Sequence, residues 1–308
     1  MSAAEASVRS VPGRTEASSW QVWTALWIVY IVWGSTYLAI SLMVETMPPL
    51  LAAGVRFVAV GLIVLPALAL KRGVAVLRPT RAELLSAGFV GLMLPGANAV
   101  ISVAEQTVPS GLAALLVASI PLWVILLRRL SGDRISGRSL AAVLVGFAGV
   151  ALVVKPQGGA SIVGPLACIG AALMWALGSF ASPRISLPRD PLASTGWQSL
   201  LGGLAVLASG LIAGEAGDVH PDHWSTRSLL GLAYLITFGS LLAFTAYAWL
   251  LQNAPISKVS TYAYVNPVVA ILLGWLINSE GISARSLAGA AIIVASVALV
   301  IRVESARR

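Results

Sequence analysis

The chain has 308 residues, of which 58% are hydrophobic and only 10% are charged, and its formal net charge is +8. A soluble domain carries about 25% charged residues, so this composition excludes a water-soluble surface and predicts a membrane protein. The basic residues are scattered between apolar runs, which excludes the concentrated basic face of a nucleic-acid-binding protein.

The chain begins with a polar segment, 1–21, that is rich in Ser, Ala, Glu and Arg. It has no apolar core, so we expect a disordered cytoplasmic tail and no cleavable signal peptide. Beyond it, a membrane span needs about 20 apolar residues. Ten windows qualify: 22–43, 49–70, 83–104, 110–128, 139–155, 162–182, 191–213, 228–251, 257–278 and 286–302. Residues 303–308 form a second cytoplasmic tail, and the expected fold class is an all-α integral membrane protein with ten transmembrane helices.

Lys and Arg predict the orientation of these spans, because cytoplasmic segments carry an excess of both. With the N-terminus inside, 16 of the 20 basic residues fall on the cytoplasmic side. Lys155, Arg227 and Arg285 fall on the opposite side, and Arg56 lies within a span. Both termini are therefore expected in the cytoplasm.

The two halves of the chain repeat a pattern of residues. Pro-Leu-x-x-x-Gly occurs at 49–54 and again at 191–196, an offset of 142, and 135–141 matches 282–288 in six of seven positions at an offset of 147. Five spans separate the copies, and because five is odd the halves have inverted topology. Inverted repeats support alternating access, since either half can adopt the conformation of its twin. The two five-helix repeats are expected at 22–155 and 162–302.

Polar and aromatic residues within the spans mark a candidate cavity. An unpaired polar side chain is costly in lipid, so such residues should face the bundle interior or water. A single Ser or Thr could instead bond to its own helix, and Trp or Tyr could belong to an interfacial belt. Their helical spacing places them on shared faces and favours the cavity. The predicted lining is Trp33, Thr36, Tyr37, Arg56, Asn98, Ser102, Trp175, Ser179, Gln198, Tyr247, Tyr262 and Asn266.

Arg56 has two interpretations. It lies seven residues after Pro49, about 10 Å from the outer end of its helix at 1.5 Å per residue. It could extend to the outer headgroups. Alternatively it could point inward and bind a substrate carboxylate or an internal partner such as Glu105. The inward position is favoured because the repeat places polar Gln198 at the matching position, and the pocket is then asymmetric in charge.

Proton coupling has few candidates in this sequence. No Asp or Glu falls at mid-depth in any predicted span, where proton antiporters usually carry one. Glu105 and Glu280, near the outer ends of spans, are the remaining candidates. Facilitated diffusion or substrate exchange is the alternative. We assign Glu105, together with Arg56, as a gate or coupling residue.

Several chemistries are not expected from this sequence. It has no Gly-x-x-x-x-Gly-Lys-Ser/Thr run for nucleotide phosphates and no evident pairing of a nucleophile with a base, so neither ATP hydrolysis nor enzyme activity is predicted. His220 and His223 share one polar loop and offer at most a weak metal site. The single cysteine, Cys168, excludes an internal disulfide. No metal and no cofactor are expected.

Four motifs resemble a known family: Tyr-Ile-Val-Trp-Gly-Ser-Thr-Tyr (30–37), Gly-Val-Arg-Phe (54–57), Glu-Gln…Val-Pro-Ser-Gly-x-Ala-Ala-Leu (105–115) and Tyr-Ala-Tyr-Val-Asn-Pro-Val-Val-Ala-x-Leu-Leu-Gly (262–274). They are similar to the EamA family of the drug/metabolite transporter superfamily, and within it to the YedA-like bacterial exporters, over about 22–303. The resemblance implies ten helices in two EamA repeats, a bacterial inner-membrane location, and export of amino acids or similar metabolites.

The predicted function is a secondary transporter that exports small metabolites, with amino acids the first substrate class. Efflux of drugs or lipophilic compounds is the alternative within transport, and a non-transporting membrane scaffold or sensor is the alternative from another class. The expected partners are a small-molecule substrate and the lipid bilayer. Small residues in the fifth and tenth spans permit close helix packing, either as a seam between the halves or as a dimer surface, so monomer and homodimer both stay open.

Overall fold

The computed structural model describes residues 18–154, 161–254, 256–281 and 283–305, and the regular elements within them are all helices. The helices are α1 (Ser19–Met43), α2 (Pro49–Arg72), α3 (Arg81–Ala104), α4 (Ser110–Val117), α5 (Ile120–Leu130), α6 (Gly137–Val154), α7 (Val163–Ala181), α8 (Pro191–Ile212), α9 (Thr226–Tyr234), the π-helix η5 (Leu235–Leu242), α10 (Ala243–Asn253), α11 (Ile256–Val259), α12 (Tyr262–Asn278) and α13 (Ala284–Ser305). Four short 3-10 turns, η1 to η4, lie in the connections.

Eight helical segments of the described chain are long and apolar enough to cross a membrane. Two shorter apolar helices, Gly137–Val153 and Tyr262–Asn278, accompany them. The membrane class and the helical fold are therefore as predicted, whereas the count of ten spans and the cytoplasmic position of the termini remain predictions. Helix α1 begins at Ser19, inside the tail expected at 1–21, and α13 continues to Ser305. Residues 1–17 of that tail, and Lys155, lie outside the described residues.

Three predicted windows are not continuous α-helices. The window 110–128 is divided, because α4 ends at Val117 and α5 begins at Ile120. Pro121 explains this break, since its ring clashes with the carbonyl four residues earlier, which is that of Val117. The window 257–278 is divided between α11 and α12, where the Thr261 hydroxyl donates to the Lys258 carbonyl at 2.6 Å and competes with the helical backbone bond.

The third window, 228–251, changes from α-helix to π-helix at η5 and back again at α10.

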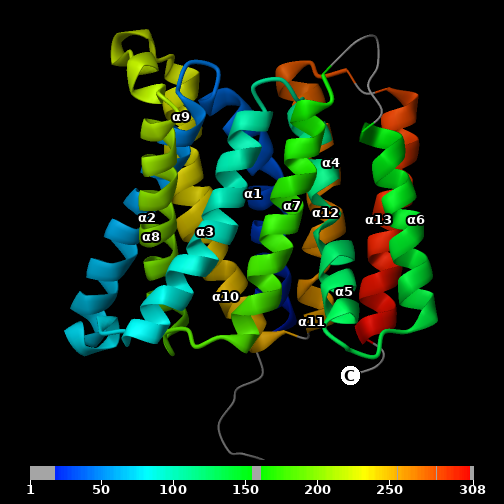
Figure 1. Ribbon diagram of the computed structural model, residues 1–308, viewed down its shortest axis with the longest axis horizontal. Coiled ribbons are helices and arrows are strands. Elements are labelled where there is room, and N and C mark those ends of the chain that lie inside the picture. The colour runs from blue at the N-terminus through cyan, green and yellow to red at the C-terminus, as the bar shows by residue number, and fades with distance from the viewer. Residues whose placement is uncertain (1–17, 155–160, 255, 282, 306–308) are drawn as a thin grey trace, which may run out of the picture.

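The helices form one bundle with two flanks and a centre (Figure 1). Helices α2, α3 and α8 pack together on one flank, α6 pairs with α13 on the other, and α1, α7 and α12 lie between them. Helix α1 begins and helix α13 ends at the same end of the bundle, which we call the terminal end (Figure 1). We call the opposite end the far end.

Reciprocal contacts relate the two halves within the α2–α8 interface. A Cβ on Gly54 would lie 2.7 Å from Leu207, and a Cβ on Gly196 would lie 2.7 Å from Leu65. Gly196 follows Gly54, and Leu207 follows Leu65, by the same offset of 142 that the repeat shows. Each contact is thus the twin of the other, as a pseudo-twofold axis between two antiparallel helices produces.

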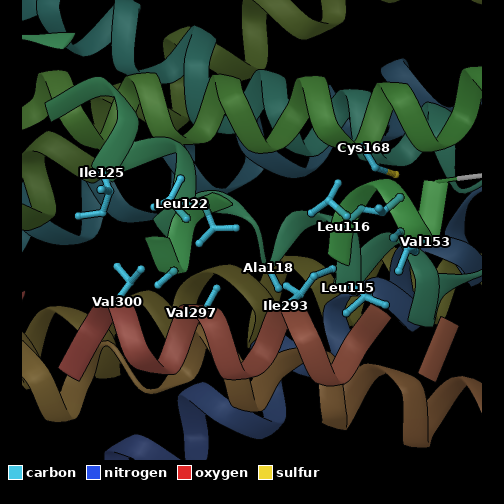
Figure 2. Close-up of a cluster of buried hydrophobic side chains, with 14 of the residues drawn as sticks. Leu115, Leu116, Ala118, Leu122, Ile125, Val153, Cys168, Ile293, Val297 and Val300 are labelled. Atoms are coloured by element: carbon cyan, nitrogen blue, oxygen red, sulfur yellow. The ribbon is translucent and has the colours of Figure 1, made fainter. Parts of the chain in front are cut away.

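The α6–α13 interface obeys the same relation at the offset of 147. A Cβ on Gly149 would lie 3.1 Å from Ile293, and a Cβ on Gly146 would lie 3.1 Å from Ser296. The small residues of these helices therefore form a seam between the halves, one of the two uses predicted for them. Beside this seam a buried apolar cluster joins α4, α5, α6, α7 and α13 (Figure 2).

Candidate functional site

A cavity lies in the centre of the bundle, among α1, α2, α3, α4, α5, α7, η5, α10 and α12. It holds about 820 Å³ of empty space, including the part that is open to solvent. Eight of the predicted residues line it: Trp33, Thr36, Tyr37, Arg56, Asn98, Trp175, Tyr262 and Asn266.

The central cavity continues into a second hollow toward the terminal end. The two share Ile120, Pro121, Trp175, Tyr262 and Ala263 in their linings. The second hollow also contains the predicted residues Ser179 and Tyr247, and it reaches the ionic side chains Arg128 and Glu304 near the ends of α5 and α13. We call this second hollow the terminal passage.

The far end of the bundle is closed. Met43 and Met47, where α1 gives way to α2, are 0% and 3% exposed. The cavity lining on α1 stops at Ile40, one turn before Met43. The structure therefore holds a conformer that is open toward the terminal end and shut at the far end.

Arg56 is a buried cation in the wall of this cavity. Its side chain is 4% exposed, donates from Nε to the hydroxyl of Ser240 at 3.2 Å, and donates from a terminal nitrogen to Asn98 Oδ1 at 3.4 Å. No ion pair joins it to a carboxylate in the described part of the chain, and Glu105 is not its partner. The guanidinium thus faces inward and its described partners are neutral. An anionic ligand would neutralise its buried charge.

The π-helix η5 places Gly239 where Arg56 and Trp33 meet. The indole N–H of Trp33 donates to the Gly239 carbonyl at 3.2 Å. A Cβ on Gly239 would lie 3.1 Å from Thr36 Cγ2 and 3.5 Å from the Arg56 guanidinium, so a glycine leaves room for both side chains. Short π-helical segments are frequent at functional sites. Here the segment turns a backbone carbonyl and the Ser240 hydroxyl toward the cavity residues.

Four aromatic rings gather where the cavity meets the terminal passage. The ring centroid of Trp33 lies 5.0 Å from that of Tyr247, 5.1 Å from that of Tyr262 and 5.5 Å from that of Phe244. Tyr262 lines both spaces, Phe244 lines the cavity and Tyr247 lines the passage. The faces of aromatic rings bind apolar groups and attract cations.

Asn266 adds an acceptor to the cavity wall. It lies on α12 one turn after Tyr262, and its buried Oδ1 atom has no hydrogen-bond partner in the part of the chain that the structure describes. A buried acceptor with no partner costs free energy, which a ligand that donates a hydrogen bond would recover.

Two predicted residues line neither the central cavity nor the terminal passage. Ser102 is 1% exposed and donates to the carbonyl of Asn98 on its own helix at 3.0 Å, which is the alternative foreseen for such residues. Gln198 donates to the Ser194 hydroxyl at 2.8 Å and lines a small neighbouring hollow. It is set back because α8 packs behind α3, where a Cβ on Gly91 would lie 2.3 Å from the Gln198 carbonyl.

Glu105 is buried outside the cavity lining. It follows the last residue of α3 and is 6% exposed, and neither carboxylate oxygen has a hydrogen-bond partner of normal geometry among the described residues. Burial, followed by the negative charge of Glu280, raises the pKa of its carboxyl well above the usual range. The backbone N–H of Ser41 opposes this increase in pKa. Burial therefore favours the protonated form of Glu105 over the ionised form in this conformer.

A metal centre is not formed by the described residues, among which no group of three or more His, Cys, Asp or Glu side chains is arranged to hold an ion. The two histidines lie close together, with ring centroids 5.6 Å apart, but His223 and the neighbouring Asp222 are each 75% exposed.

Sequence reasoning missed several lining groups. Ala263, Ile120 and the carbonyl-bearing Gly239 are small or apolar and had no polar signal in their spans. Pro121 and Pro267 also line the cavity, and the sequence offered a signal for them because they occupy matching positions at an offset of 146.

Comparison with known proteins identifies relatives along most of the chain. The model of the EamA-like transporter family matches residues 22–155 and 162–302. The chain is 38% identical over 283 residues to the "uncharacterized inner membrane transporter YedA" of Escherichia coli (strain K12), covering 90% of this chain and 89% of that protein. It is 30% identical over 274 residues to "Protein PecM" of Dickeya dadantii (strain 3937), covering 87% and 88%. One solved crystal structure has a TM-score of 0.64 at 24% identity, covering 94% of this chain and 99% of that chain, and shares the fold.

Proposed function

This chain belongs to the EamA-like transporter family, and from that premise we propose that it exports amino acids or related small metabolites by alternating access, without ATP. In alternating access the two inverted repeats exchange conformations around a fixed central site. The cavity walled by both repeats is that site in this proposal.

The observation that carries the substrate class is the environment of Arg56. A guanidinium has five N–H donors, and within the described part of the chain protein groups accept from two of those of Arg56. A carboxylate fits such a group with two parallel hydrogen bonds and neutralises its buried charge. A substrate with a carboxylate is therefore favoured over a cationic drug, which Arg56 would repel.

The remaining polar lining supports a zwitterion. Asn266 Oδ1 offers an acceptor to an ammonium N–H, and the faces of Trp33 and Tyr262 attract a cation. Among the described residues, those that line the cavity include no Asp or Glu, so an ammonium group would bind there through neutral groups. An amino acid places both of its charged groups within the reach of one small cavity.

The direction of transport rests on two further observations. The open passage lies at the terminal end, which the distribution of Lys and Arg assigns to the cytoplasm. A relative covering most of the chain is named an inner membrane transporter. In this proposal the conformer takes up substrate from the cytoplasm and releases it after the far end opens.

Counterflow in liposomes tests the proposal. Purified protein is reconstituted in vesicles loaded with one unlabelled amino acid at a time, and entry of the same labelled amino acid is measured beside a panel of cationic dyes. We expect accelerated entry of at least one amino acid and of no cationic dye. Entry of dyes without entry of any amino acid would establish the efflux alternative instead. A pH gradient imposed in the same assay reports whether transport is coupled to protons.

A further inference from the structure

At the far end, a carboxylate of the second repeat binds backbone N–H groups of the first repeat. Glu280 lies in the connection between α12 and α13, and its two oxygens accept the backbone N–H groups of Ser110 at 2.9 Å and of Gly111 at 3.0 Å, 170 and 169 positions away. These N–H groups belong to the first turn of α4, where no acceptor is available within the helix. A negative charge is also favoured there by the helix dipole.

This contact is coupled directly to the cavity through α4. The helix carries the Glu280 contact at its first residues and lines the cavity at Ala114 and Val117. The Glu280 carboxylate also packs closely against α12, because a Cβ on Gly274 would lie 2.5 Å from it. Helices α4 and α12 pack against each other, and a separation of the two at this end would break the Glu280 contact.

The inverted repeat provides a twin of Glu280 at the other end of the bundle. The offset of 147 assigns Asp133, in the connection between α5 and α6, to the same position. The backbone agrees, since the preceding residues Gly132 and Ser279 have φ values of 91° and 51°. Ser279 is the one residue other than glycine with a positive φ in the described chain, so the repeat preserves this turn even without glycine.

Asp133 has different partners from its twin in this conformer. Its carboxylate accepts from Arg128 Nε at 2.9 Å and lies 3.9 Å from the Arg184 guanidinium. The start of α4 follows Pro109, and the matching position after Pro255 is the start of α11. One acidic residue thus caps the helix where the bundle is shut, while its twin binds arginines where the passage is open.

We propose that Glu280 is the latch that closes the far end, and that Asp133 is its twin, which leaves Arg128 and engages the backbone at the start of the α11–α12 segment when the terminal end closes. This inference rests on the alternating access of the proposed function and not on the substrate class. Each repeat then contributes one acidic residue, and in each of the two end states a single latch is engaged.

Thiol labelling tests the latch without any substrate. Cys168 is the only cysteine, so Cys168→Ala gives a background for single reporters. Leu115→Cys reports on the far end, because Leu115 is 1% exposed and lines the small hollow beside Glu280. Ser179→Cys reports on the terminal passage, which its side chain lines. The rate of reaction with a membrane-impermeant maleimide is measured from each side of oriented vesicles.

Glu280→Gln is expected to increase the labelling rate of Leu115→Cys from the far side about tenfold and to decrease that of Ser179→Cys. A tenfold change corresponds to about 1.4 kcal/mol of lost preference for the closed state. Asp133→Asn is expected to act in the opposite direction, keeping Ser179→Cys reactive and Leu115→Cys protected. The double variant should return toward the parent. Misfolding would expose both reporters together, so opposite changes in the two rates identify the latch.

Glu215→Gln is the matched control at the same end of the bundle. The Glu215 carboxylate also caps a helix, accepting from the backbone N–H groups of Leu50 at 3.1 Å and Leu51 at 2.8 Å. It joins α2 to the connection after α8, and these two helices are packed through close glycine contacts. We expect both reporters to be labelled in Glu215→Gln at the same rates as in the parent. Unchanged rates in Glu280→Gln, or the same shift in Glu215→Gln, would overturn the proposal, and neither result depends on which substrate is transported.

Discussion

The Arg56 guanidinium on α2 donates to the Ser240 hydroxyl on η5 at 3.2 Å, across 184 positions of sequence. This bond joins the first repeat to the second inside the cavity wall. It orients one edge of the guanidinium toward the protein, while the terminal nitrogens lie toward Asn98 and Gly239. The remaining donors of the group are therefore positioned in advance for a ligand, which reduces the entropy lost on binding.

Arg56→Gln is expected to lower the initial rate of amino acid counterflow at least about tenfold, because a hydrogen bond to a charged group contributes about 1.5–3 kcal/mol. Arg56→Lys should restore only part of the rate, since lysine keeps the charge and loses the planar pair of donors. The matched control is Arg78→Gln, which removes an exposed arginine and should leave the rate unchanged. Equal transport by Arg56→Gln and the parent, at equal protein in the vesicles, would exclude Arg56 from substrate binding.

Trp33→Ala is expected to abolish transport and to lower the thermal stability of the purified protein, because three aromatic contacts and one hydrogen bond are lost together. Trp33→Phe keeps a ring and loses the bond to the Gly239 carbonyl, which should cost about 1 kcal/mol. Trp20→Ala is the control, since Trp20 is 68% exposed. The prediction is contradicted if Trp33→Ala and Trp20→Ala melt at the same temperature and transport equally well.

Gly202→Ala is expected to destabilise the fold by about 1–3 kcal/mol, because overpacking forces neighbouring backbone apart. A Cβ at Gly202 would lie 2.4 Å from the Gly91 carbonyl oxygen, and a main-chain atom cannot rotate away as a side chain does. Gly170→Ala is the matched control on α7, where no atom lies within 4 Å of the added Cβ. It should be neutral or stabilising by up to about 1 kcal/mol through helix propensity. Melting temperatures in detergent compare the two variants directly.

The buried carboxyl of Glu105 should make the opening of the far end depend on pH. Its pKa is raised while the carboxyl is buried, and it should return toward about 4.3 once the end opens to water. Protonation therefore favours the closed conformer. This stabilisation is complete below the ordinary pKa and is lost as pH rises through the raised pKa.

Labelling of Leu115→Cys from the far side should accordingly increase with pH. Glu105→Gln cannot ionise, so it should flatten this dependence, and the reagent's own pH dependence cancels in the comparison of the two proteins. Glu280, Tyr37 and Cys168 are the other ionisable groups in electrostatic range of the carboxyl. Glu45→Gln, which removes a carboxylate that is 34% exposed, serves as the control. An identical pH profile in Glu105→Gln and the parent would refute the role of Glu105.

The sequence by itself was sufficient for the membrane class and for most helix positions, because both depend on local runs of apolar residues. Helices α2 and α8 begin at Pro49 and Pro191, where the repeated motif predicts them. The cavity was also largely predictable, since a polar side chain within a span has few places to go except inward. Arg56, Asn98 and Asn266 follow this rule.

Other parts of the site depend on packing between elements distant in sequence. Gln198 is as polar as Asn98, yet it is set back from the cavity because α8 packs behind α3. The Gly239 carbonyl reaches Trp33 because η5 is π-helical, and no side-chain pattern predicts that change in the backbone.

Only the tertiary structure decided which end of the bundle is open. The two repeats share their sequence pattern, so the acidic residues Glu280 and Asp133 are both able to serve as a latch. In this conformer Glu280 caps α4 and Asp133 binds Arg128. Because the two repeats have similar sequences, either repeat can adopt either of the two conformations. Which repeat adopts which conformation depends on the contacts between the halves.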